Sequence, residues 1–237
     1  MPNRPHLCIL GFGAFGELVA RALAPFCDLS VIDPSPEAAA RAVERGFTLA
    51  ALHDLPRADI VVLAMPVPAL APTLRLIAPH LRPGQLVMDV CSIKDEPARL
   101  MQDCLPPDVE ILASHPMFGP QSTVDGFRGA RIVLCPLRGN GWRRIAAFLR
   151  RHGLEVIRAT PAEHDRQAAL TQGLTHLLAQ AFRTLGPQPT IRTKSFDLMM
   201  SALAQVSGDA PEVYQAVTAA NPHFAEARAR LIGAMMA

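Results

Sequence analysis

The sequence lacks the patterns that mark membrane, secreted, zinc-binding and nucleic-acid-binding proteins. Its five cysteines are scattered and form no CxxC pair, so neither a disulfide framework nor a metal site is expected. The net charge of +2 comes without a Lys/Arg block, which argues against nucleic acid as a partner. Four prolines interrupt the most apolar stretch, residues 60–81, whereas a membrane helix needs ~20 largely uninterrupted apolar residues. The first residues have no signal-peptide pattern, so we expect a cytoplasmic protein with reduced thiols and no membrane contact.

The first two thirds of the chain alternate short apolar runs with helical stretches. This alternation is typical of parallel strands joined by crossover helices. We expect strands over residues 6–10, 29–32, 60–63, 86–89, 110–113, 131–134 and 154–157. Helices are expected between them, over residues 14–23, 36–45, 67–78, 95–104 and 142–150. The pattern predicts an α/β fold of the Rossmann type, with a doubly wound, mainly parallel sheet.

The alternation stops after residue 157, and the rest of the chain has helical periodicity. The segment Thr160-Pro161-Ala162-Glu163 is typical of a capping box with proline at the first helical position. That helix should run to about residue 185 and end at Gly186-Pro187. Further helices are expected over roughly 193–206, 211–219 and 223–235. We therefore predict two domains: residues 1–158 bind the nucleotide, and residues 159–237 form a small all-helical domain that buries surface against the first domain or a second subunit.

A glycine-rich turn follows the first predicted strand and opens the first predicted helix. It comprises Gly11, Phe12, Gly13, Ala14, Phe15 and Gly16. Asp33 lies 22 residues beyond Gly11, at the end of the second strand, which completes a dinucleotide-binding pattern. In that pattern the glycines allow a tight turn, close approach of the pyrophosphate and close helix packing. The alternative is a glycine turn that binds no nucleotide.

Asp33 favours NAD over NADP, because its carboxylate should accept hydrogen bonds from the ribose and repel a 2′-phosphate. The alternative for Asp33 is a solvated turn residue before Pro34. NADP remains possible, since Arg41 and Arg45 follow on the next helix.

Two loops after later strands are predicted to face the nicotinamide half, because ligands of open α/β sheets bind outside the carboxyl ends of strands. The first contains Met65, Pro66 and Val67, and the second contains Ser92. Ser92 could instead cap a helix, with Asp95 three residues on.

His115 follows another predicted strand, and the proline after it should hold it in a rigid loop. A neutral imidazole suits removal of a hydroxyl proton during alcohol oxidation. A lone histidine is nevertheless more often structural than catalytic.

As a set, several segments resemble the prephenate and arogenate dehydrogenases of tyrosine biosynthesis. They are GFGAFG, LAMPV, DVCSIK, SHPMFGP, EHD (residues 163–165), TQGLTH (171–176) and TKSFD (193–197), the last being most similar to arogenate-type members. The resemblance implies oxidative decarboxylation of a cyclohexadienol with NAD(P), and a homodimer formed through the helical domain. It also implies that His115 is the catalytic histidine at the ring 4-hydroxyl and that Ser92 is a second catalytic residue near the nicotinamide and that hydroxyl. It further implies that His176 belongs to the substrate site.

The predicted helical domain contributes a polar stripe to this site. Gln172, Thr175 and His176 are spaced i, i+3 and i+4, so they share one face of an otherwise apolar helix. The alternative is a hydrogen-bonded patch between packed helices. For His164 and Asp165, in the first turn, a structural role is expected.

Three cations are predicted to bind the carboxylates of the small-molecule substrate: Lys94, Arg192 and Lys194. Three other functions stay open. A dehydrogenase for a 4-amino-4-deoxyprephenate-type substrate would share the same motifs. A β-hydroxy acid dehydrogenase would usually need a lysine in the helix of residues 161–185, which has none. A non-enzymatic NAD-sensing protein would not need His115, Ser92 and His176 together.

Overall fold

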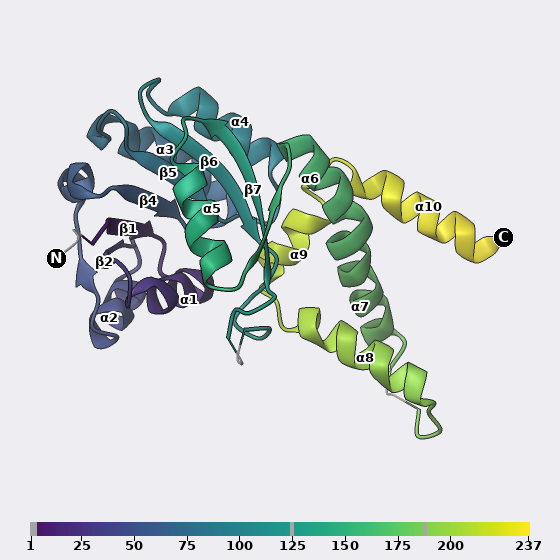
Figure 1. The fold of residues 1–237 in the computed structure, drawn as a ribbon. Coiled ribbons are helices and arrows are strands. Elements are labelled where there is room, and N and C mark those ends of the chain that lie inside the picture. The colour runs from purple at the N-terminus through teal and green to yellow at the C-terminus, as the bar shows by residue number, and fades with distance from the viewer. Residues whose placement is uncertain (1–3, 124–125, 187–188) are drawn as a thin grey trace. The chain divides into compact units, whose positions relative to one another are not determined.

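The computed structural model describes residues 4–123, 126–186 and 189–237 (Figure 1). The chain divides into two compact units, of which the first ends at Pro161 and the second begins at Ala162. The sequence predicted this boundary after residue 158. The predicted helix stop at Gly186-Pro187 lies partly outside the described residues, because Pro187 is not among them. No helix within the described ranges is long and apolar enough to cross a membrane.

The first unit contains one eight-stranded sheet with the order β3-β2-β1-β4-β5-β6-β7-β8. The strands are β1 (His6–Leu10), β2 (Asp28–Ile32), β3 (Thr48–Leu49), β4 (Ile60–Leu63), β5 (Leu86–Asp89), β6 (Glu110–Pro116), β7 (Arg131–Arg138) and β8 (Glu155–Arg158). Every neighbouring pair is parallel except β6 and β7, which are antiparallel. The predicted Rossmann-type, mainly parallel sheet is therefore confirmed.

Three strands, β2, β6 and β7, are longer than predicted, and β3 was missed. β6 continues through His115 to Pro116, because the polar residues after Ala113 pair with the apolar strand β7. The prediction that His115 lies in a loop is therefore wrong. β3 has only two residues, both exposed, and so it gave no hydrophobic pattern to detect.

Helices cover both faces of the sheet, which makes it doubly wound (Figure 1). The helices of the first unit are α1 (Ala14–Leu23), α2 (Pro36–Glu44), α3 (Val67–Ile77), α4 (Asp95–Cys104), α5 (Trp142–Arg151) and the short 3-10 turns η1 (Leu52–Arg57) and η2 (Ala78–His80). One hydrophobic cluster contains Leu74 of α3 and Met101 of α4. The other contains Ala20 of α1, Ala42 of α2 and Ala146 of α5.

The described part of the second unit is helical, as predicted. It contains α6 (Pro161–Ala168), a π-helical turn η3 (Ala169–Gly173), α7 (Leu174–Thr184), α8 (Lys194–Ser207), α9 (Pro211–Val217) and α10 (Phe224–Met236). The helix predicted from residue 161 to 185 is thus interrupted by η3. The small core of the second unit packs Phe224 against Ala169 and Ala227. A Cβ on Gly173 would lie 2.8 Å from the Phe224 ring.

Candidate functional site

The glycine turn joins β1 to α1, and its three glycines have different surroundings. Gly11 has φ +96°, and a Cβ there would lie 2.9 Å from the carbonyl carbon of Ala64. A Cβ on Gly16 would overlap the carbonyl of Gly11. A Cβ on Gly13, in contrast, would have nothing within 4 Å. Gly11 and Gly16 are therefore required by the fold, whereas Gly13 borders open space.

Asp33 ties this turn to the end of β2. Its carboxylate accepts the backbone N–H of Phe12 at 2.5 Å and that of Ser35 at 2.8 Å. Arg41 of α2 donates to the carbonyl of Phe12 at 3.1 Å. Asp33 is thus part of the turn's architecture rather than a merely solvated residue. The ring of Phe12 is fully buried against Phe47, so it cannot contact a cofactor bound at the turn.

The open space at Gly13 fits the phosphates of a dinucleotide. Gly13 is the N-cap residue of α1 and supplies no side-chain hydrogen bond to the helix N-terminus. A helix N-terminus of this kind offers backbone N–H groups and a partial positive charge to an anion. Ala14 is exposed beside it, and the ring of Phe15 lies 6.3 Å from that of Phe118. The residues present therefore fit the predicted nucleotide.

Two loops leave the carboxyl ends of β4 and β5. Met65, Pro66 and Val67 follow β4, and Pro66 is the N-cap residue of α3. The thiol of Cys91, on the β5 loop, donates to the carbonyl of Met65 at 3.5 Å, so the two loops are linked. Desolvation by burial raises the pKa of the Cys91 thiol well above its usual value, and the neighbouring carboxylate of Asp89 acts in the same direction.

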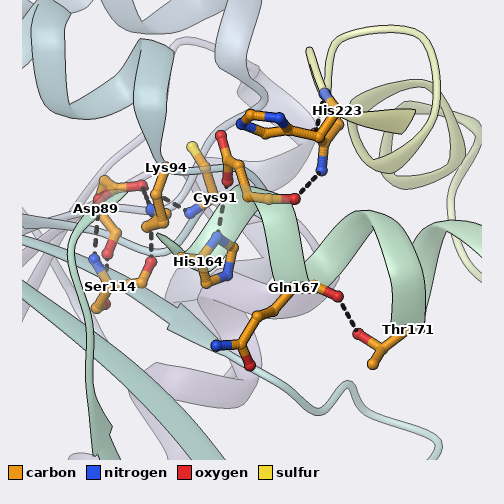
Figure 2. A network of polar contacts seen from close by, with 10 residues as sticks. Asp89, Cys91, Lys94, Ser114, His164, Gln167, Thr171 and His223 are labelled. Atoms are coloured by element: carbon orange, nitrogen blue, oxygen red, sulfur yellow. Dashed lines mark hydrogen bonds and ion pairs between the residues drawn. The ribbon is translucent and has the colours of Figure 1, made fainter. Parts of the chain in front are cut away.

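A buried polar network joins the β5 loop to β6 (Figure 2). The carboxylate of Asp89 forms an ion pair with Lys94, and both side chains are 0% exposed. Asp89 also accepts the backbone N–H of Ser114 at 3.1 Å, and its own carbonyl accepts the Ser114 hydroxyl at 2.6 Å. Lys94 donates to the carbonyl of Ser114 at 2.7 Å. This geometry disfavours Lys94 as a substrate-binding cation, because its charge already neutralises Asp89 inside the protein.

Ser92 is half-buried in the middle of that loop. α4 begins at Asp95 with Lys94 as its N-cap residue, so the alternative that Ser92 caps this helix is wrong. His115 is 3% exposed and is paired with Val133 across the antiparallel ladder of β6 and β7. Because His115 directly follows Ser114, the network connects the strand that carries His115 to the loop that carries Ser92.

The helical unit places His176 in a buried polar environment on α7. Its Nε2 lies 3.4 Å from a carboxylate oxygen of Asp209, and its ring centroid lies 6.2 Å from that of Tyr214. Desolvation by burial lowers the pKa of His176, although the carboxylate of Asp209 opposes this shift. Burial likewise raises the pKa of Asp209, opposed by His176. Both shifts favour the uncharged forms.

Two buried polar atoms in this unit accept or donate no hydrogen bond among the described residues: Oε1 of Gln172 and Nε2 of His176, whose 3.4 Å contact with Asp209 lacks hydrogen-bond geometry. Buried polar atoms are usually satisfied, so unsatisfied ones suggest a ligand or water partner. Gln172 lies in the π-turn η3, whereas Thr175 donates its hydroxyl to the carbonyl of Thr171. The π-turn therefore alters the helical spacing on which the predicted polar stripe was based.

A cavity of about 260 Å³ lies within the helical unit beside His176. Arg183, Asp209 and Tyr214 also line it, and sequence reasoning missed all three. Arg183 could have been found, because it follows His176 by seven residues on the same helix. Asp209 and Tyr214 come from a later segment and gave no such signal.

The two predicted cations of the helical unit lie elsewhere. Arg192 pairs with Asp197 at 3.0 Å, and Lys194 is exposed at the start of α8. Neither lines this cavity, so their role in substrate binding stays a prediction.

The remaining polar pair of the helical unit fits the expected structural role. His164 contacts the carboxylate of Asp165 at 2.7 Å (Figure 2), and Asn221 donates to the carbonyl of Asp165 at 2.9 Å. In the described ranges, no group of three or more His, Cys, Asp or Glu side chains could hold a metal ion.

A larger cavity, of about 1170 Å³, lies between α1 and α5 in the first unit. Its lining is mainly apolar and includes Phe15, Phe118 and Phe148.

Comparison with known proteins gives the family. Residues 19–156 match the nucleotide-binding domain of prephenate dehydrogenase. The chain is 31% identical over 195 residues to a probable arogenate/prephenate dehydrogenase of Methanocaldococcus jannaschii, covering 76% of this chain and 43% of that protein. It is 29% identical over 240 residues to the chloroplastic arogenate dehydrogenase 1 of Arabidopsis thaliana, covering 95% of this chain and 38% of that protein. The chain thus spans about two fifths of the length of these curated relatives.

A solved structure shares the fold over nearly the whole chain. It is the prephenate dehydrogenase of Aquifex aeolicus in complex with hydroxyphenyl propionate and NAD+. The TM-score is 0.79 at 18% identity, with 98% of this chain and 88% of that chain covered. This likeness shows the fold. The match over residues 19–156 and the relative of 31% identity establish that the chain belongs to the prephenate dehydrogenase family.

Proposed function

We propose that the protein is an NAD-dependent dehydrogenase that converts a cyclohexadienol into a 4-hydroxyphenyl product by oxidative decarboxylation. The observation that carries this proposal is the buried network that connects His115 on β6 with the Ser92 loop after β5. The family match over residues 19–156 supports the same reaction class.

In the proposed reaction, His115 accepts the proton of the ring hydroxyl while a hydride leaves the same ring carbon. Bound NAD supplies the hydride acceptor. The opposite ring carbon then loses its carboxylate as carbon dioxide, and the electron pair of that bond makes the ring aromatic. The ring oxygen recovers a proton as the phenol forms. Ser92 orients the hydroxyl for this transfer, so that one imidazole serves as base and then as acid.

NAD is proposed over NADP because Asp33 lies where the ribose hydroxyls should bind. The two arginines that could bind a 2′-phosphate have other partners. Arg41 donates to the carbonyl of Phe12, and Arg45 pairs with Glu17 at 2.9 Å.

Arogenate is proposed over prephenate because residues 193–197 are most similar to arogenate-type members. The relative in Arabidopsis thaliana is likewise an arogenate dehydrogenase. Arogenate carries an amino-acid side chain, with an ammonium and a carboxylate, whereas prephenate carries a keto acid.

A homodimer through the helical unit is also proposed. Large hydrophobic side chains are exposed there: Leu185, Ile191, Leu198, Met199, Ile232, Met235 and Met236. Exposed apolar side chains in such numbers favour a protein interface. Light scattering after size exclusion should give twice the 25.6 kDa chain mass.

One absorbance assay tests the proposed function. Prephenate and arogenate are each combined with NAD and with NADP, and reduced nicotinamide is followed. The highest kcat/KM is expected for arogenate with NAD. A 4-amino-4-deoxyprephenate arm tests the related substrate class. NAD binding without turnover of any of these acids would contradict the proposal and favour an NAD-sensing protein.

A further inference from the structure

The carboxyl ends of β5 and β6 are joined by side chains rather than by the backbone alone. The parallel ladder pairs Leu86 with Glu110 and continues to Met88 with Leu112. Beyond it, Ser114 donates its N–H to the Asp89 side chain and its hydroxyl to the Asp89 backbone carbonyl. The separation of the two strand ends is therefore set by Asp89 and Ser114.

The Asp89–Lys94 pair also closes the loop that carries Ser92 (Figure 2). Asp89 is the last residue of β5, and Lys94 is the N-cap residue of α4. Inside the loop, the backbone N–H of Cys91 donates to the same Asp89 oxygen at 2.9 Å. The loop is thus held at both ends and once between them.

The same ammonium reaches β6, because Lys94 donates to the carbonyl of Ser114, which immediately precedes His115. One charged group therefore bonds to the loop of Ser92 and to the strand of His115. A buried ion pair is weak evidence for stability, since an apolar pair of similar size is often as stabilising. The directional bonds of this ion pair, however, fix the position of the Ser92 loop relative to β6, which apolar packing would leave free.

We propose that Asp89 and Lys94 are positioning residues that hold Ser92 and His115 in register for proton and hydride transfer. This inference rests on the proposed function. Neither side chain touches the reacting atoms. They act by fixing the two elements that carry those residues, and small displacements of catalytic groups reduce turnover.

The test is the double variant Asp89→Asn/Lys94→Met, which removes both buried charges and keeps similar volumes. Its kcat per folded molecule, with the folded fraction taken from circular dichroism, should fall roughly 10–100-fold. The Kd for NAD should change much less than kcat, because the glycine turn at the N-terminus of α1 is untouched. A purely structural role would lower the folded fraction and leave kcat per folded molecule unchanged.

The matched control is Asp103→Asn/Arg99→Met, which removes an exposed ion pair of 3.1 Å on α4 by the same type of substitution. Wild-type kcat is expected there. If the double variant fails to fold, Lys94→Met alone provides the comparison, since the Asp89 carboxylate then keeps the backbone N–H donors of Cys91 and Ser114.

Amide hydrogen exchange provides a second readout that needs no substrate. Exchange should accelerate over residues 90–94 and 115–117 of the double variant and stay unchanged over residues 86–88. Wild-type kcat in the double variant, or acceleration spread over the whole sheet, would overturn the inference. If the wild-type protein turns over neither acid, the proposed function fails, and the exchange pattern still decides whether the pair fixes these two segments.

Discussion

Replacing Gly13 with alanine should weaken cofactor binding without unfolding the protein. The residue has φ −73° and ψ −171°, an extended conformation that any L-amino acid adopts, and an added Cβ would meet nothing within 4 Å. The lower entropy of the unfolded chain favours alanine by about 0.4–1 kcal/mol, whereas alanine is a poorer N-cap residue than glycine by a similar amount. The two effects offset, so the free energy of unfolding should change by less than about 1 kcal/mol.

The expected loss of affinity follows from the same geometry. The methyl group would occupy the space beside the N-terminus of α1 where a phosphate should approach the backbone. Losing one charge-assisted hydrogen bond costs about 1.5–3 kcal/mol, which raises Kd roughly 10- to 150-fold. Titration calorimetry with NAD measures Kd, and thermal unfolding measures stability.

Two further glycines complete the experiment. Gly16→Ala would drive a Cβ into the carbonyl of Gly11, and overpacking of this kind costs about 1–3 kcal/mol. Its Tm should fall by roughly 2–12 °C. Gly233→Ala, on α10 with nothing within 4 Å, is the control and should bind NAD as wild type does. A folded Gly13→Ala protein with unchanged Kd for NAD would refute the reasoning.

Three other predictions concern ionisable side chains. His115→Asn should lower kcat by ~10²–10⁴-fold and leave the Kd for NAD unchanged, because it removes only the base; near-wild-type turnover would contradict the assignment. Asp209→Asn should move the NMR titration of the His176 ring to lower pH, since Asp209 is the group that raises the His176 pKa; an upward shift would contradict the geometry. The Cys91 thiol, whose pKa burial raises, should resist iodoacetamide at pH 8 until the protein unfolds. Because unfolding restores its ordinary pKa, this thiol stabilises the fold fully below about pH 9 and loses that contribution as the pH rises further. Mass spectrometry of native and denatured samples measures the labelling.

Local sequence patterns were sufficient for most of the first unit. The strand β1 and the helices α1 and α4 have the predicted bounds, because β1 is a continuous apolar run and both helices alternate apolar and polar residues with helical periodicity. The glycine turn and Asp33 were found for the same reason, since their spacing reflects steric limits within one β-turn-α unit.

Features that depend on a distant partner were not predicted. The extension of β6 through His115 depends on β7, whose pairing residues lie beyond an intervening loop. The buried state of Lys94 depends on Asp89 and Ser114, and a lysine is rarely buried unless it is paired. The contact of His176 with Asp209 joins residues of α7 and the loop before α9, and the π-turn η3 changes the face on which Gln172 lies.

The sequence by itself determined the α/β class and the glycine turn with Asp33, because these depend on local periodicity and spacing. The tertiary structure alone decided that Lys94 is buried in an ion pair with Asp89, and that His115 lies in a strand. It also brought Arg183 and Asp209 to one cavity. These features arise from burial and long-range pairing, which give a side chain its charge partners only after the chain has folded.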